Sequence, residues 1–179
     1  MNNQQIAVFA GGCFWCTEPV FSQLKGVSKV VSGYIGGHTN NPTYKEICNG
    51  DTGHAEGIQI TFDADVIAFE TLLEIFFASH DPTTPNRQGN DVGTQYRSAV
   101  FCQSDAQKAA TLNMIKQLNA EEIWPSPIVT QINDAAIFYP AEDYHQYYFD
   151  KNPFQPYCLA VAAPKAAKIR AKYAELIKD

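Results

Sequence analysis

A cysteine stands near the start of the chain, where an apolar run gives way to a helix-like segment. Residues 8–18 read Val-Phe-Ala-Gly-Gly-Cys-Phe-Trp-Cys-Thr-Glu, with Cys13 directly after two glycines. We predict Cys13 at a helix N-terminus, where unpaired backbone N–H groups and the helix dipole stabilise an anion. Its thiol should then ionise below the free pKa of about 8.5, and the thiolate is the nucleophilic form. The stretch favours a reactive cysteine over an inert core cysteine.

Three neighbours of Cys13 bear on its chemistry. The aromatic residues Phe14 and Trp15 follow it directly, and they suit either the wall of a substrate pocket or packing on a sheet. Cys16 completes a Cys-x-x-Cys spacing, which is typical of dithiol–disulfide oxidoreductases. One alternative function is therefore dithiol–disulfide exchange without any other chemistry.

A structural zinc module is the second alternative. Its ligands would be Cys13, Cys16, Cys48 and His54. The chain lacks the second Cys or His pair that zinc-finger spacing requires, so we expect no metal.

Two long loops combine polar side chains with glycines. Residues 81–96 show no apolar periodicity and end in Gln-Tyr-Arg, and loops beyond about 12–15 residues in a compact domain are usually functional or disordered. Residues 33–57 hold six glycines together with Tyr44 and Glu56. Polar side chains on such loops suit a site held by a rigid scaffold.

Composition limits the class of protein. The 179 residues are 45% hydrophobic and 18% charged, and we expect one catalytic domain over 1–179. The net charge of −6 argues against nucleic acid as a partner, and no apolar run approaches the roughly 18 residues of a membrane span. The N-terminal residues lack the features of a signal peptide, and five cysteines form an odd, scattered set. We therefore expect a cytoplasmic protein without a disulfide framework.

The pattern of apolar residues predicts alternating strands and helices. Strands are expected at 6–9, 27–34, 57–62 and 97–102, with weaker ones at 128–130 and 136–139. Helices are expected at 13–24, 42–48, 64–79, 105–120 and 142–149, with a last basic helix from Pro164. The first six major elements read β-α-β twice, which predicts an α+β two-layer sandwich with a split βαβ (ferredoxin-like) core and a mixed sheet. From about residue 151 we expect an irregular C-terminal segment before the basic helix.

Seven motifs together resemble one known family. They are Gly-Cys-Phe-Trp-Cys-Thr-Glu at 12–18, Ser-Gly-Tyr-Ile-Gly-Gly at 32–37, Asn-Pro-Thr-Tyr at 41–44, Thr-Gly-His-Ala-Glu at 52–56, Gly-Asn-Asp-Val-Gly-Thr-Gln-Tyr-Arg-Ser at 89–98, Tyr-Pro-Ala-Glu-Asp-Tyr-His-Gln at 139–146 and Asn-Pro-Phe-Gln-Pro-Tyr-Cys at 152–158. In this order they resemble the A-type peptide methionine sulfoxide reductases, over about residues 5 to 158. That family's fold is an α/β sandwich on a split βαβ core.

The resemblance implies reduction of the S epimer of methionine sulfoxide, free or in proteins, and thereby repair of oxidative damage. Cys13 would attack the sulfoxide sulfur and Glu56 would protonate the oxygen. A carboxyl beside Phe14 and Trp15 should have a raised pKa, because desolvation disfavours its charged form. Phe14 and Trp15 would hold the terminal methyl group of the substrate.

The same resemblance implies roles for three polar residues. Tyr44 and Tyr96 would donate hydrogen bonds to the sulfoxide oxygen, where negative charge develops. Asp91 matches a family position that supports the site. No cofactor is implied.

A second cysteine would resolve the Cys13 sulfenic acid into a disulfide. Cys158 follows two prolines in the expected irregular segment, so it should be mobile, and its sequence context resembles the recycling cysteine of the family. Cys16 is the alternative, and it is also a departure, because many members have glycine there. We predict a Cys13–Cys158 disulfide, thioredoxin as the reductant, and a monomer.

Overall fold

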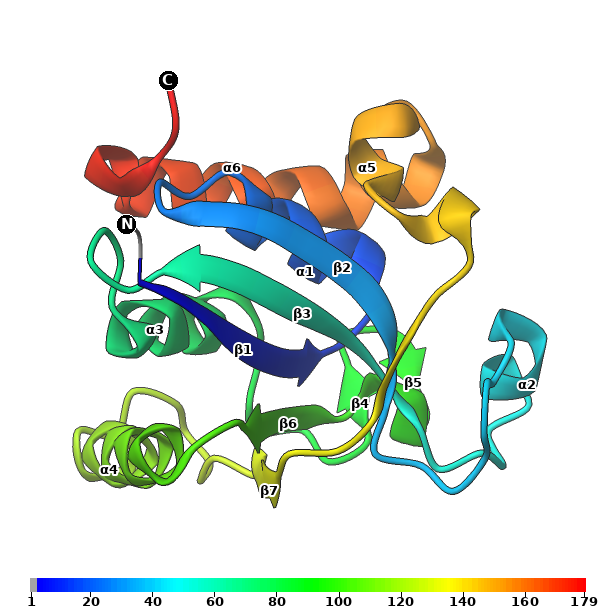
Figure 1. Cartoon of the computed structure of the whole chain (residues 1–179), viewed down its shortest axis with the longest axis horizontal. Coiled ribbons are helices and arrows are strands. Elements are labelled where there is room, and N and C mark those ends of the chain that lie inside the picture. The colour runs from blue at the N-terminus through cyan, green and yellow to red at the C-terminus, as the bar shows by residue number, and fades with distance from the viewer. Residues whose placement is uncertain (1–2) are drawn as a thin grey trace.

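The computed structural model describes residues 3–179 (Figure 1). Six strands form one sheet in the order β7-β6-β1-β3-β2-β8, in which all neighbours are antiparallel except β6 and β7. The sheet strands are β1 (Gln4–Gly11), β2 (Val27–Ile35), β3 (Ala55–Asp63), β6 (Ser98–Cys102), β7 (Gln131–Asp134) and β8 (Phe138–Pro140). The architecture is thus mixed α/β with a mixed sheet, as the sequence pattern predicts.

Helices and a small hairpin complete the chain. The helices are α1 (Phe14–Ser22), α2 (Tyr44–Cys48), α3 (Phe69–Ser79), α4 (Asp105–Ala120), α5 (Tyr148–Lys151) and α6 (Ala163–Lys172). Strands β4 (Arg87–Gln88) and β5 (Asp91–Val92) pair inside the loop 81–96, which then forms a short 3-10 turn at Thr94–Tyr96. Further short turns lie at Asp143–His145, Cys158–Ala162 and Ala174–Leu176.

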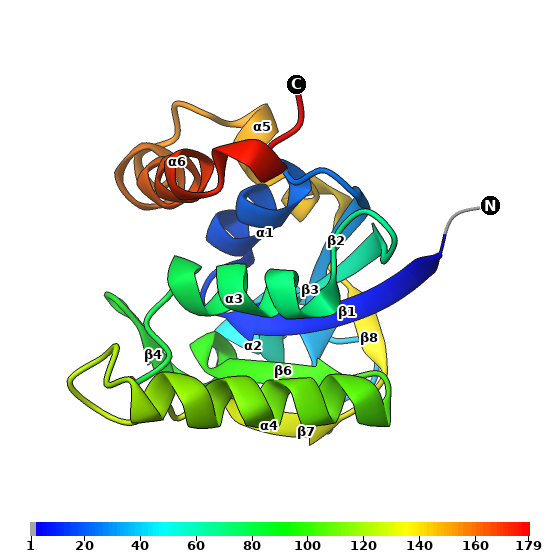
Figure 2. The same ribbon diagram turned by 90° about the vertical axis from the view of Figure 1, so that its left-hand side faces the viewer.

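The main core lies between one face of the sheet and helices α1, α3 and α4 (Figure 2). Alternate residues of β3 supply it, and Ile58, Ile60 and Phe62 are fully buried, as the period of two predicts. Phe9 from β1 stacks on Phe76 of α3 with ring centroids 4.8 Å apart. Phe9 also packs on Phe21 of α1, with ring centroids 5.6 Å apart, and this contact fixes α1 and its start against the sheet.

Helix α6 lies outside α1 and α3 and packs on both (Figures 1 and 2). A smaller apolar cluster of Val8, Ala10, Ile35 and Phe101 covers the opposite face of the sheet. None of the helices between residues 3 and 179 has the length and apolar composition that a bilayer crossing requires.

Several predicted boundaries are wrong. The third helix begins at Phe69 rather than Ala64, and the expected strand 128–130 lies at Gln131–Asp134 beside β6. The expected helix 142–149 is two short pieces, because Tyr147 adopts a left-handed conformation with φ +51°. A non-glycine residue in that region does not continue a right-handed helix.

The prediction of an irregular segment from about residue 151 is also wrong. Only residues 152–155 are irregular, and a π-type turn at Cys158–Ala162 runs directly into α6. Cys158 and Ala162 are fully buried and pack against Cys16 of α1. This apolar contact orders the segment, so Cys158 sits in packed helical structure in this form of the protein.

A buried polar chain ties the end of α3 to the sheet. His80 Nδ1 lies 2.6 Å from the Phe76 carbonyl, and its Nε2 lies 2.8 Å from Ser98 Oγ, which contacts Thr130 Oγ1 at 2.7 Å. Burial lowers the pKa of His80 to about 4. His80 is therefore a neutral structural residue at neutral pH.

Candidate active site

The site begins where β1 turns into α1. Cys13 is the N-cap residue of α1, and its carbonyl accepts hydrogen bonds from the backbone N–H of Cys16 (3.0 Å) and Thr17 (3.3 Å). Gly12 allows the turn, since its φ is +95° and a Cβ there would lie 2.7 Å from Gln88 Cγ. Cys13 is half-buried, so part of its thiol region stays accessible. The predicted position of Cys13 at a helix N-terminus is confirmed.

Glu56 lies on β3, and its side chain extends to the start of α1 beside Cys13. Its side chain is 1% exposed, and Oε1 accepts a hydrogen bond from the Phe14 backbone N–H at 3.1 Å. Oε2 is buried without a hydrogen-bond partner among the residues that the structure describes. Burial raises the pKa of Glu56 to about 8, against the opposing effects of the Phe14 N–H and the Cys13 thiol. The carboxyl is therefore mostly protonated at pH 7.

The prediction of a lowered Cys13 pKa is wrong for this form of the protein. Burial raises the pKa of Cys13 well above its ordinary value, and the nearby Glu56 carboxylate raises it further. The helix N-terminus does not outweigh these two effects. At neutral pH the resting pair is thus a thiol beside a carboxylic acid.

Tyr44 and Tyr96 come to the site from separate loops. Tyr44 opens α2, where a capping box of Thr43 and Glu46 fixes the helix start and Glu142 Oε2 accepts from the Tyr44 N–H at 3.0 Å. Both tyrosines are half-buried, and burial and then Glu56 raise the pKa of each phenol. Both hydroxyls therefore stay protonated and can donate hydrogen bonds near Glu56.

A tyrosine of the motif at 152–158, to which the sequence analysis assigned no role, links two predicted residues. The Tyr157 hydroxyl donates to Asp91 Oδ2 at 2.6 Å and accepts from Cys16 Sγ at 3.4 Å. Asp91 stands in β5 within the loop 81–96. This chain of bonds places Asp91 beside the cysteine cluster.

The two aromatic residues after Cys13, Phe14 and Trp15, differ in burial and in packing partners. Phe14 is fully buried and packs on Tyr34, with ring centroids 5.7 Å apart. Trp15 is half-buried and stacks on Tyr148 at 3.9 Å and 7°. The Trp15 indole N–H donates to His145 Nδ1 at 3.0 Å. Trp15 is therefore the aromatic surface nearest Cys13 that a ligand can reach.

His145 is a site residue that sequence reasoning assigned no chemistry. It is 1% exposed, and its ring lies 4.5 Å from that of Tyr44 and 5.0 Å from that of Phe14. Its position in the Tyr-Pro-Ala-Glu-Asp-Tyr-His-Gln motif is the signal that could have found it. Since Nδ1 accepts from Trp15, the neutral ring carries its proton on Nε2.

Three of the five cysteines form one cluster. Cys16 and Cys158 are buried against each other, and Cys13 packs on them from the start of α1. Burial raises the pKa of Cys16 to about 11 and also raises that of Cys158. Cys48 is exposed on α2, and Cys102 is buried at the end of β6.

The zinc alternative finds no support in this arrangement. His54 Nδ1 accepts from the Gly37 N–H at 3.0 Å, and its Nε2 lies 2.8 Å from the Thr39 carbonyl, so both ring nitrogens are engaged. Over residues 3–179 no group of three or more His, Cys, Asp or Glu side chains is placed to hold a metal ion.

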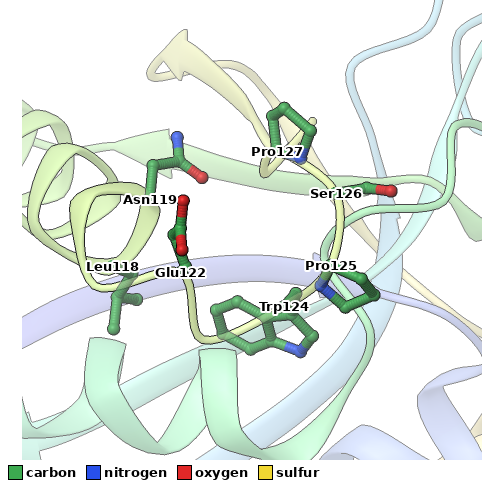
Figure 3. A pocket seen from close by; sticks show the side chains of 7 residues that line it. All are labelled: Leu118, Asn119, Glu122, Trp124, Pro125, Ser126 and Pro127. Atoms are coloured by element: carbon green, nitrogen blue, oxygen red, sulfur yellow. The ribbon is translucent and has the colours of Figure 1, made fainter.

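A surface cavity without reactive cysteines lies elsewhere. It measures about 590 Å³ and follows the end of α4, where Trp124 lies between Leu118 and Pro125 (Figure 3). It has no residue in common with the surroundings of Cys13. The reactive groups, rather than cavity size, identify the site.

Comparison with known proteins agrees with the geometry. The family model for peptide methionine sulfoxide reductase matches residues 5–177. The peptide methionine sulfoxide reductase MsrA of Chromobacterium violaceum is 53% identical over 173 residues, which cover 97% of this chain and 98% of that protein.

Solved structures show the same likeness. The reduced form of Mxr1 from Saccharomyces cerevisiae has a TM-score of 0.79 and 36% identity, covering 86% of this chain and 88% of that one. Mxr1 in complex with Trx2 has a TM-score of 0.58 and 26% identity, covering 82% and 85%. With the family model spanning nearly all of its length, the chain belongs to the peptide methionine sulfoxide reductase family.

Proposed function

We propose that this protein reduces the S epimer of methionine sulfoxide, free or in proteins, to methionine. The observation that carries the proposal is the contact region of Cys13 and Glu56, where a nucleophilic sulfur meets a buried carboxyl that is protonated at neutral pH. A sulfoxide sulfur is a poor electrophile until its oxygen gains a proton. The pair supplies both groups that the reaction requires.

Cys13 and Glu56 together account for both proton transfers of the reaction. As Cys13 sulfur bonds to the sulfoxide sulfur, Glu56 gives its proton to the oxygen and receives the proton of the Cys13 thiol. The hydroxyl then moves from the substrate sulfur to the Cys13 sulfur as the S–S bond between them breaks, which leaves Cys13 as the sulfenic acid and releases methionine as the sulfide. The raised pKa of Cys13 fits this order, because the thiol proton is lost only when sulfur attacks.

Tyr44 and Tyr96 stabilise the oxygen as its negative charge develops. Both hydroxyls are held as donors close to Glu56, since the Glu56 charge raises the pKa of each. Trp15 would contact the methyl group of the substrate, and His145, on which both Trp15 and the fully buried Phe14 pack, supports it. Asp91 holds the Tyr157 hydroxyl and thereby the edge of the site.

An intramolecular disulfide then forms with loss of water from the sulfenic acid. Cys158 stays our predicted partner for Cys13, and Cys16 stays the alternative. The cluster supports either partner, because all three thiols share one buried contact region. A disulfide with either partner needs Cα atoms within about 7 Å and suitable Cβ directions.

We expect one equivalent of sulfoxide to produce mainly the Cys13–Cys158 disulfide. The measurement is alkylation of the remaining thiols followed by peptide mapping. A dominant Cys13–Cys16 bond, together with sustained thioredoxin-supported turnover of Cys158→Ser, would show that Cys16 resolves the sulfenic acid.

The function itself is tested with a small chiral substrate. With dithiothreitol as reductant, we expect the protein to consume the S epimer of methyl p-tolyl sulfoxide and to leave the R epimer, because sulfoxide reductases act on one epimer each. Chiral chromatography with quantified sulfide product is the measurement. Consumption of neither epimer, with reduction of a disulfide substrate intact, would favour the dithiol–disulfide alternative.

Further expectations extend this proposal. A thioredoxin-type dithiol would return the disulfide to two thiols by exchange, which fits the likeness to Mxr1 in its complex with Trx2. The strand order β6-β1-β3-β2 with antiparallel neighbours supports a split βαβ core, with α1 and α3 as the two crossover helices. The single domain over 1–179, the monomeric state and the cytoplasmic location stay predictions.

A further inference from the structure

A groove of about 450 Å³ runs between the C-terminal end of α3, helix α6 and the loop after α4. These segments lie together along the left edge of Figure 2. Lys165, Lys168 and Lys172 line it from α6, and Gln88 and Trp124 line it from the other side. We propose that the dithiol protein that reduces the enzyme binds in this groove through an acidic face. This proposal rests on the function proposed above.

The three lysines form one stripe. They are spaced at i, i+3 and i+7, which puts them on the same side of a helix, next to the buried positions Ala166 and Ile169. The one ion pair found among residues 3–179 is Lys108–Asp134, so the stripe has no carboxylate within 4.0 Å. Three unpaired cations on a chain of net charge −6 form a local surface that attracts an acidic partner.

The rest of the groove suits a protein partner. Asp81 also lines it, but its Oδ1 already accepts from the Thr83 backbone N–H (3.0 Å) and hydroxyl (2.6 Å). Ile123 is 55% exposed and Trp124 is half-buried beside it. An apolar centre beside a polar rim matches the general anatomy of protein–protein interfaces.

The groove lies close to the thiols that a reductant must reach. Gln88, at one end, lies against Gly12, the residue before Cys13. The positive charge of Lys165 acts on the Cys16 thiol and favours its thiolate form. Helix α6 continues directly from the turn that carries Cys158.

The same chain segment offers exposed apolar side chains around Cys158. Phe154 is 83% exposed and Leu159 is 52% exposed, although Cys158 itself is fully buried. The three lysines thus lie on the helix that directly follows the turn with Cys158, the predicted resolving cysteine. In the proposed reaction the oxidised polypeptide substrate reacts instead at Cys13, near Glu56 and the two tyrosines that Glu56 influences. This placement favours the reductant over the substrate as the occupant.

The test replaces Lys165, Lys168 and Lys172 together by glutamate. The matched control makes the same change at Lys25, Lys29 and Lys116, which are lysines on other elements. Methionine sulfoxide reduction is followed with thioredoxin, recycled by its reductase and NADPH, and separately with dithiothreitol. A third set of assays, with dithiothreitol, compares acidic and basic methionine sulfoxide peptides.

We expect kcat/KM for thioredoxin to fall about tenfold or more in the groove variant at low ionic strength, and the loss to shrink with added salt. The control variant and all dithiothreitol rates should stay within about twofold of wild type. Changing the three lysines to methionine keeps their apolar stems, and it should cause a smaller loss in the same direction.

Three results would overturn the docking proposal. The first is an unchanged kcat/KM for thioredoxin, and the second is an equal loss in the control variant. The third is a loss confined to acidic peptides, which would make the groove a substrate surface. Absence of sulfoxide reduction by the wild type with dithiothreitol would instead refute the proposed function.

Discussion

Replacing Cys13 by serine should abolish sulfoxide reduction, even with excess dithiothreitol. Serine has nearly the shape of cysteine, but its hydroxyl is a poor nucleophile toward sulfur and its alkoxide is too basic to form here. Loss of a catalytic nucleophile costs of the order of 10⁶ in kcat in a well-studied protease, and we expect at least about 10³. The measurement is sulfide formed per enzyme under saturating substrate.

Cys102→Ser is the matched control for this variant. Cys102 is also buried, but it lies at the end of β6, away from the cysteine cluster. Its replacement should leave the rate within about threefold of wild type, since its neighbours include hydrogen-bonding groups such as Thr111. Turnover of Cys13→Ser within tenfold of wild type would remove Cys13 as the nucleophile.

Replacing Glu56 by glutamine should slow formation of the sulfenic acid by about 10²–10⁴, the usual contribution of general acid catalysis. The amide keeps the shape of the side chain and can still accept from the Phe14 N–H, but it has no proton to give. A single-turnover experiment with excess enzyme isolates this step. Glu18→Gln is the control, because Glu18 is another buried glutamate, on α1, whose pKa burial raises to about 7.

The pH dependence separates an acid from a structural carboxyl. Glu56 is protonated below its pKa of about 8 and loses its proton above it. The rate ratio of wild type to Glu56→Gln should therefore be largest below pH 8 and fall as pH rises through 8. Removal of the Glu56 charge also lowers the pKa of the Cys13 thiol, so the ionisation of Cys13 is followed separately in each protein by the pH dependence of its alkylation. A ratio that stays flat across this range, or equal single-turnover rates, would exclude Glu56 as the acid.

The sequence predicts the two residues of the proposed reactive pair and the raised pKa of Glu56, but it does not predict the raised pKa of Cys13. Cys13 and Glu56 stand in motifs whose order and residue types are specific, so the sequence alone is enough to name both. The pKa of Cys13 depends instead on how tightly distant segments close over α1 and on the charge of Glu56. Sequence reasoning weighed only the local helix dipole, and burial proved to be the larger effect.

The same division holds for the fold. Strands with a period of two, such as β3, and helices with a clear apolar face, such as α4, are predicted within a few residues. The turn at Cys158–Ala162 is not, because two nearby prolines suggest irregular chain while contact with Cys16 imposes order. Tertiary packing decides such short segments, and local sequence does not record it.

The hydroxyl of Tyr157 connects two segments that are far apart in the sequence, the loop 81–96 and the cysteine cluster. It donates to Asp91 in the loop, while the next residue in the chain is Cys158. Because Tyr157 directly precedes Cys158, a disulfide that moved Cys158 would also disturb the hydrogen bonds of Tyr157 to Asp91 and Cys16. Oxidation of the predicted resolving cysteine would in that way change the surroundings of Asp91 in the distant loop 81–96.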